Sequence, residues 1–213
     1  WETFHLYAPL AHRLGLYPIK SEMEDLAMKH IYPKEYKFIV KKLRETTSSR
    51  NRFIRSFIEP IEQELKNRHF DFEIKGRPKS VYSIFRKMQK QDVDFEDVYD
   101  VFAIRIILNT DPEHEKSDCW QVYSIITDKY TPNPERLRDW ISAPKSNGYE
   151  SLHTTVLGPE GKWIEVQIRT SRMDEIAEKG FAAHWKYKGI KQEQGVDEWV
   201  SMVRNILESP DGS

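Results

Sequence analysis

The chain has 213 residues, of which 38% are hydrophobic, so it is long enough to bury a core and is not expected to be disordered. Its 33 Lys and Arg residues nearly balance its 34 Asp and Glu residues, which gives no support to a nucleic-acid coat protein or a membrane-surface binder. The one cysteine, Cys119, excludes an internal disulfide and a cysteine-based metal cage. No stretch approaches the about 20 apolar residues that span a bilayer, so we expect no membrane partner. Because the charges balance, we expect no direct nucleic-acid binding either, and we interpret the chain as a cytoplasmic protein. Because Trp1 opens within an amphipathic pattern, we also expect the sequence to be part of a longer protein.

The first third of the chain carries helical patterns. Apolar residues at helical spacing predict a helix over 3–15 and a second over 20–30, which Tyr32-Pro33 ends. Residues 35–68 are predicted to form one long helix or two, because Pro60 lacks an amide hydrogen and imposes a kink or a boundary. These segments predict a small helical unit ahead of the remaining elements.

Strands and helices then alternate irregularly. Residues 69–74 alternate as a strand that Gly76-Arg77-Pro78 ends, and Pro78 suits the first turn of a helix over 79–90. An apolar run rich in β-branched residues predicts a central strand over 100–108. The later elements are predicted as a helix over 116–129, strands over 153–157 and 162–169 around the turn 158–161, and helices over 172–187 and 197–207. This order predicts an α+β fold, a mixed sheet of four or five strands with flanking helices, preceded by the helical segment.

The loop 143–153 and the strand that follows it concentrate groups suited to nucleotides. Tyr149 can stack on a base, and Lys145 can meet a phosphate. Glu165 alternates with aliphatic residues on the last strand, so it is either part of a wet strand face or a metal ligand or general base in a cleft. Together these residues predict a nucleotide-handling site.

Two further patterns have a structural and a functional interpretation. On the helix over 79–90, the basic stripe Lys79, Ser83, Arg86, Lys87 and Lys90 is either a solvated cationic face or, with the positive amino end of the helix, a triphosphate site. At the strand over 100–108, Asp100 and Arg105 are costly to bury unless each has a partner. Asp100 is therefore either paired or a ligand of a divalent metal. A zinc site, a P-loop and a dinucleotide-binding glycine turn are not expected, because their spacings do not occur in the sequence.

Several stretches together resemble the synthetase domain of RelA/SpoT-type stringent-response enzymes, in consistent order over about 70–188. They are Gly76–Lys79 with Tyr82–Ile84 and Arg86–Met88, Tyr99–Val101 with Ala103–Ile106, Pro144–Tyr149 with Ser151–Thr155, Glu165–Thr170, and Ala182–Lys186. Residues 7–15 resemble the closing helices of the amino-terminal hydrolase domain of that family. The metal-binding His-Asp motif of that domain is missing here, so this chain is not expected to hydrolyse the product.

The resemblance implies a nucleotidyltransferase-like sheet and a GTP pyrophosphokinase activity. Such an enzyme transfers the terminal pyrophosphate of ATP to the ribose 3′-hydroxyl of GDP or GTP, with Mg2+, to make the alarmone (p)ppGpp. By the resemblance, the ATP phosphates would be held by Arg77, Lys79, Ser83 and Lys87, and the guanine nucleotide by Lys145, Asn147, Tyr149 and His153. Asp100 would bind Mg2+, Glu165 would be a metal ligand or a base toward the 3′-hydroxyl, and the supporting residues would be Arg105, Gln167 and Arg169.

The resemblance also divides the chain. Residues 1–33 would be the last helices of an HD-type hydrolase domain, 34–69 linking helices, 70–190 the synthetase domain and 191–213 a C-terminal helix. The expected partners are ATP and GDP or GTP as substrates, and the ribosome through regions outside this sequence. The acidic run 94–97 leaves the preference between GDP and GTP open, because synthetase-only members tend to be acidic there and many bifunctional members carry a basic residue. A catalytically silent guanine-nucleotide-binding module and a polymerase-like transferase acting on RNA are the alternatives.

Overall fold

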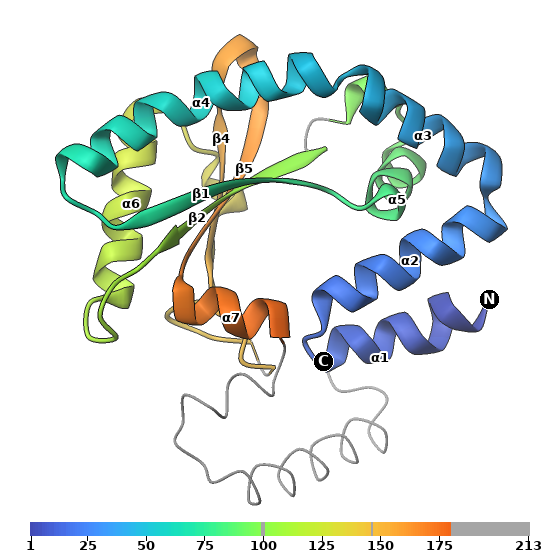
Figure 1. Cartoon of the computed structure of the whole chain (residues 1–213), viewed down its shortest axis with the longest axis horizontal. Coiled ribbons are helices and arrows are strands. Elements are labelled where there is room, and N and C mark those ends of the chain that lie inside the picture. The colour runs from blue at the N-terminus through green and yellow to red at the C-terminus, as the bar shows by residue number, and fades with distance from the viewer. Residues whose placement is uncertain (99–100, 146, 180–213) are drawn as a thin grey trace, which may run out of the picture.

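A five-stranded mixed sheet forms the centre of the computed structural model, which describes residues 1–98, 101–145 and 147–179 apart from the side chains of Arg77 and Asp97 (Figure 1). The strands, in the order β1-β2-β5-β4-β3 across the sheet, are β1 (Phe72–Pro78), β2 (Phe102–Leu108), β5 (Trp163–Thr170), β4 (Leu152–Leu157) and β3 (Arg138–Asp139). β2 and β5 are parallel, and the other neighbouring pairs are antiparallel. The predicted mixed sheet of an α+β fold is confirmed, with β3 as a short strand that the sequence did not indicate.

Helices precede the sheet and flank it (Figure 1). The helical elements are the π-helix η1 (Thr3–Tyr7), α1 (Ala8–Arg13), α2 (Tyr17–Ile31), α3 (Pro33–Glu45), α4 (Thr47–Asn67), α5 (Val81–Gln91), α6 (Glu115–Lys129) and α7 (Ser171–Lys179), with short 3-10 turns η2 (Phe95–Asp97), η3 (Pro134–Arg136) and η4 (Pro159–Gly161). The predicted helix over 197–207, the end of the one over 172–187 and the segment 191–213 lie outside the described residues. Within the described ranges, no helix has both the length and the apolar content that a bilayer crossing requires.

The main hydrophobic core lies between one face of the sheet and helices α4 and α6. Alternate residues of β2 and β5, including Ile104, Ile106 and Val166, are fully buried in it. Because neighbouring residues of a strand point to opposite faces, the intervening positions, such as Arg105 and Gln167, belong to the other face. That second face carries the polar residues of the candidate site.

The helix boundary in the linking segment falls at Thr46, between α3 and α4, and not at Pro60. The boundary at Pro60 that the sequence allowed is therefore wrong, since this proline lies inside α4. Proline removes one backbone hydrogen bond, but α4 buries Phe57 and Ile61 on either side of it against the sheet. Tertiary packing thus carries the helix through the proline.

The first strand and the helix after it are shifted from their predicted positions. β1 starts at Phe72 and includes Gly76 to Pro78, where the sequence predicted its end. This is allowed because β1 is an edge strand, in which a proline without an amide hydrogen leaves no central ladder bond unmade. α5 starts at Val81, after an N-cap at Ser80, so Lys79 lies in the connection before the helix and not on its surface.

A second apolar cluster joins the amino-terminal helices to α5. Met28 of α2, Ile39 of α3 and Ile84 and Phe85 of α5 are buried together in it. α2 also contacts α7, which packs against β2 and β5. These contacts place α2 beside the second face of the sheet.

Candidate active site

A cavity of about 480 Å³ opens on the second face of the sheet, among α2, α5, α7 and the loop before β4. It brings together nine of the predicted site residues: Lys79, Ser83, Lys87, Arg105, Lys145, Tyr149, His153, Gln167 and Arg169. Residues far apart in the sequence, from both halves of the proposed site, therefore share one hollow. Asn147 and Glu165 are not in its lining but bond to residues that are, and Asp100 and the Arg77 side chain lie outside the described residues.

One wall of the cavity is cationic. Lys79 precedes α5, where its amide donates to Val101 O at 2.9 Å. Ser83 and Lys87 follow one turn apart on α5, and both line the cavity. Arg86 is exposed and donates to the Tyr82 hydroxyl at 3.4 Å. The basic stripe is thus divided: Lys79, Ser83 and Lys87 line the cavity, and the solvated-face interpretation holds for Arg86.

The amino end of α5 is already occupied by a carboxylate of α2. Asp25 accepts hydrogen bonds from the amides of Val81, at 3.2 Å, and Tyr82, at 2.8 Å. Burial raises the pKa of Asp25, although these two hydrogen bonds oppose the shift. The Ser80 hydroxyl accepts from the amide of Ser83 at 3.2 Å. The predicted phosphate site at this helix end therefore depends on side chains, because Asp25 and Ser80 take up the first amides.

Glu165 lies between the cationic wall and the aromatic part of the site. It pairs in register with Ala103 of β2 and Thr155 of β4. Its Oε2 is 3.3 Å from Lys79 Nζ, and its Oε1 accepts from Gln167 Nε2 at 2.9 Å. Burial by itself raises the pKa of Glu165, but the Lys79 ammonium and the Gln167 amide outweigh it and hold that pKa below its ordinary value. The carboxylate is therefore ionised at neutral pH.

His153 is a neutral side chain held against Tyr149. Its Nε2 shares a 2.8 Å hydrogen bond with the Tyr149 hydroxyl. Burial lowers the pKa of His153 well below its ordinary value, and nearby cations including Arg169 lower it further, while Glu165 opposes the shift. His153 Nδ1 is 3.9 Å from Glu165 Oε1, but a neutral imidazole makes this a polar contact and not an ion pair.

The Tyr149 ring is almost completely enclosed, with 8% of the residue exposed. Lys145 Nζ lies 5.0 Å from the ring centroid, and the Arg169 guanidinium lies 5.7 Å from it. Tyr17 of α2 and Trp140 pack against the ring in edge-to-face geometry, at centroid distances of 5.4 Å and 5.8 Å. A base that stacks on Tyr149 must therefore displace one of these neighbours.

A tight turn presents Tyr149. The amide of Gly148, whose φ is 74°, donates to Lys145 O at 2.8 Å, and the amide of Lys145 donates to Tyr149 O at 3.1 Å. Asn147 Oδ1 accepts from the Tyr149 amide at 3.2 Å, and its Nδ2 donates to the Tyr17 hydroxyl at 2.8 Å. Asn147 thus shapes the turn and connects it to α2.

Two buried arginines line the cavity. Arg105 Nη1 donates to Asp174 at 3.0 Å and to Glu178 at 2.8 Å, both on α7. Arg169 Nη2 donates to Gln167 Oε1 at 2.8 Å, and its Nη1 is 3.5 Å from Asp174 Oδ1. Arg105, expected to be costly without a partner, is therefore paired. Arg169 is 1% exposed, so the polar face of β5 is not a solvent-exposed face at this end.

Trp140 and Tyr17 are the site residues that sequence reasoning missed. Lys145 Nζ lies 4.1 Å from the Trp140 ring centroid, and the Trp140 ring packs edge-on against His153 at 4.7 Å. The available signal for Trp140 was an aromatic residue three positions before the loop 143–153. No local pattern indicates Tyr17, which lies 130 residues from the asparagine that it contacts.

Comparison with known proteins identifies the family. The family model described as "Region found in RelA / SpoT proteins" matches residues 76–192, more than half of the chain. The chain belongs to the RelA/SpoT family. This RelA/SpoT chain is 42% identical over 210 residues to a GTP pyrophosphokinase of Photobacterium angustum, which covers 97% of the chain and 28% of the relative. It is 43% identical over 215 residues to a guanosine-3′,5′-bis(diphosphate) 3′-pyrophosphohydrolase of Aquifex aeolicus, covering 100% of the chain and 30% of the relative.

The RelA/SpoT chain thus spans less than a third of the length of these relatives. Among solved structures, it resembles the small alarmone synthetase 1 from Bacillus subtilis bound to its product pppGpp, with a TM-score of 0.50 and 21% identity. That match covers 79% of this chain and 98% of the other. At this identity the similarity shows the fold, a nucleotidyltransferase-like sheet.

Proposed function

We propose that this RelA/SpoT chain transfers the terminal pyrophosphate of ATP to the ribose 3′-hydroxyl of GDP or GTP and so makes (p)ppGpp. The observation that carries the proposal is the joint cavity, in which cationic side chains and an aromatic group flank one ionised carboxylate. Two nucleotides need these parts: cations for polyphosphate, a ring for a base and an acid between them. The relatives are named for both the synthesis and the hydrolysis of this nucleotide, so their names alone do not decide the direction.

In this proposal the cationic wall holds the donor. Lys79 and Lys87, with the Ser83 hydroxyl between them, bind the phosphates of ATP, and Arg77 adds a cation from β1. Lysine ammonium groups act as point charges on phosphate oxygens and neutralise the charge of the transferring group. Their contribution is to orient the β-phosphorus toward the acceptor.

The acceptor lies against the loop before β4. Guanine stacks on Tyr149, while Lys145, Asn147 and His153 surround the nucleotide, and Gln167 and Arg169 support the pocket from β5. Because His153 is neutral, it takes part through hydrogen bonds and not through charge. The aromatic group therefore selects for a base, and the ammonium of Lys145 selects for an attached phosphate.

Glu165 acts where the two substrates meet. The 3′-oxygen forms a bond to the β-phosphorus of ATP, the bond from that phosphorus to the bridging oxygen of the α-phosphate breaks, and AMP leaves. Glu165 accepts the proton of the 3′-hydroxyl or, in its other role, binds the metal. Its ionised state suits both.

The fit of a divalent cation can be tested on Glu165, whose ionised carboxylate is the hard oxygen ligand that Mg2+ prefers. We propose Mg2+ as the cofactor, with Glu165 and Asp100 as its ligands. Bound Mg2+ would neutralise phosphate charge.

The same proposal assigns 1–33 to the end of a hydrolase domain, 34–69 to linking helices, 70–190 to the synthetase domain and 191–213 to a C-terminal helix. It also includes the ribosome as a partner of the whole protein.

The test is product formation by the purified chain. Incubation with ATP, GDP and Mg2+ should release AMP and guanosine tetraphosphate, separated by anion-exchange chromatography. Folded protein that binds both nucleotides by calorimetry and gives no product would show a silent binding module instead. Extension of a labelled RNA without tetraphosphate would show a polymerase-like transferase.

A further inference from the structure

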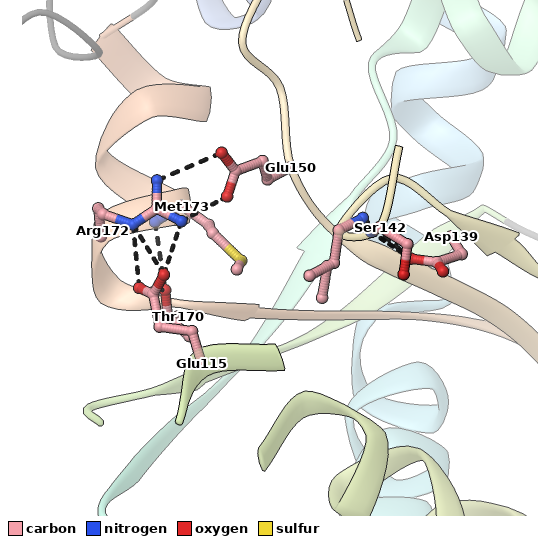
Figure 2. Close-up of polar contacts among 8 residues, drawn as sticks. Glu115, Asp139, Ser142, Glu150, Thr170, Arg172 and Met173 are labelled. Atoms are coloured by element: carbon pink, nitrogen blue, oxygen red, sulfur yellow. Dashed lines mark hydrogen bonds and ion pairs between the residues drawn. The ribbon is translucent and has the colours of Figure 1, made fainter. Parts of the chain in front are cut away.

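Arg172 lies in the first turn of α7, outside the cavity lining, and joins three separate segments of the chain (Figure 2). Its Nε donates to Glu115 Oε1 at 3.0 Å and to Oε2 at 2.9 Å, and its Nη2 donates to Oε2 at 2.6 Å. It also donates to both carboxylate oxygens of Glu150, from Nη1 to Oε1 at 3.3 Å and from Nη2 to Oε2. Two carboxylates from distant parts of the sequence thus share one guanidinium.

This cluster is mostly removed from solvent. The side chains of Glu115, Glu150 and Arg172 are 10%, 14% and 22% exposed. The Thr170 hydroxyl donates to Glu115 Oε1 at 2.6 Å. Although burial lowers the pKa of Arg172, its hydrogen bonds to the two carboxylates raise that pKa overall. A partly buried, multiply bonded pair of this kind holds its geometry far better than a surface ion pair.

The carboxylate of Glu150 belongs to the residue directly after Tyr149. The next residue, Ser151, is fully buried and donates to Ile168 O at 3.2 Å. At the other end of the same loop, Asp139 Oδ1 accepts from the amides of Ile141, at 3.0 Å, and Ser142, at 2.9 Å (Figure 2). The segment between these anchors carries Trp140, Lys145 and Tyr149.

We propose that Arg172 is a positioning residue for the guanine nucleotide. By holding Glu150 against Glu115, at the start of α6, it fixes the backbone that presents the Tyr149 ring. The inference rests on the proposed function, because it assigns the acceptor to this ring. A displacement of the ring by about 1 Å is enough to lose most of the benefit of a preorganised site.

The test compares substitutions at both ends of the Arg172–Glu150 contact. Arg172→Met leaves two carboxylates facing each other, and we expect it to weaken GDP binding by about tenfold or more, the effect of losing one charge-assisted contact. ATP affinity should change by less than about twofold, because the cationic wall lies on α5 and the connection before it, whereas the cluster joins α6, α7 and the loop before β4. Arg172→Lys keeps the charge without the paired geometry and should fall between the wild type and Arg172→Met.

Calorimetry with GDP and ATP gives the direct readout, and the KM of each substrate gives the kinetic one. Arg68→Met is the matched control, since Arg68 bonds to Glu64 on the exposed surface of α4 and lines no part of the cavity. If Arg172→Met does not fold, Glu150→Gln decides, because it leaves the Arg172–Glu115 pair intact.

Selective loss of GDP affinity, with partial retention in Arg172→Lys, supports the inference. Unchanged GDP affinity in Arg172→Met and Glu150→Gln overturns it, as does an equal loss for ATP and GDP, which would indicate a general structural effect. In these cases the wild type still binds GDP, and the proposed function stands. Wild-type protein that does not bind GDP overturns the proposed function and this inference together.

Discussion

Tyr17 of α2 covers the ring on which we place the guanine base, so its removal should tighten binding of the guanine nucleotide. Its ring packs against the Tyr149 ring in edge-to-face geometry at a centroid distance of 5.4 Å, and its hydroxyl accepts from Asn147 at 2.8 Å. An aromatic pair contributes about 0.5–1.5 kcal/mol, and a neutral hydrogen bond contributes about as much. If both contacts must break before guanine stacks, Tyr17→Ala should lower the Kd for GDP by about 5- to 150-fold, the equivalent of about 1–3 kcal/mol.

Isothermal titration of GDP and of ATP measures this effect. Tyr17→Phe keeps the ring and removes only the hydroxyl, so it should give about half of the change in free energy. Tyr7→Ala is the control, because Tyr7 is 49% exposed on η1 and has no part in the cavity. GDP binding that is unchanged or weaker in folded Tyr17→Ala would refute the reasoning, since Tyr17 would then not compete with the base.

Three further predictions concern the carboxylate, the buried histidine and the cysteine. Glu165→Gln should lower turnover, measured by rapid-quench assay, by at least about 100-fold, while calorimetry should show that ATP affinity is largely kept. Glu160→Gln is the control, because Glu160 is exposed. Unchanged turnover in Glu165→Gln would remove Glu165 from the mechanism. Below pH 6.5 the unfolded chain protonates His153 but the folded chain does not, so the stability of the wild type should fall between pH 6.5 and 5 by up to about 2 kcal/mol more than that of His153→Gln. If urea denaturation shows that the free energy of unfolding changes equally in the two proteins between these pH values, the prediction is contradicted. Burial raises the pKa of Cys119 to about 12, so iodoacetamide at pH 8 should modify it only in urea, and rapid labelling of the native protein would show that this region opens.

Periodicity predicted the sheet well, because side-chain alternation on a half-buried strand reflects burial directly. On β5, Ile164 and Val166 are buried in the core, and Glu165 and Gln167 lie on the opposite face, as their alternation predicts. The start of α5 was placed too early, at Lys79. Ser80, a capping serine directly before the first helical residue, is the sequence signal that indicates the correct start.

Contacts across long stretches of sequence could not be predicted in this way. Asp25 lies 56 residues from Val81, and Tyr17 lies 130 residues from Asn147, yet both shape the site. Their positions follow from the packing of α2 against α5 and α7, which depends on the complementary shapes of the assembled helices and not on any local pattern. For the same reason Pro60 did not end a helix, since burial of Phe57 and Ile61 outweighs one missing hydrogen bond.

The fate of the terminal phosphate of ATP tests the central claim most directly. With ATP labelled at the γ-phosphate, GDP and Mg2+, the chain should place the label in guanosine tetraphosphate and release an equal amount of AMP. With 3′-deoxy-GDP as the acceptor, no labelled guanosine product should form, because the attacking hydroxyl is absent. Label released as inorganic phosphate with ADP, or label transferred equally well to 3′-deoxy-GDP, would contradict the account.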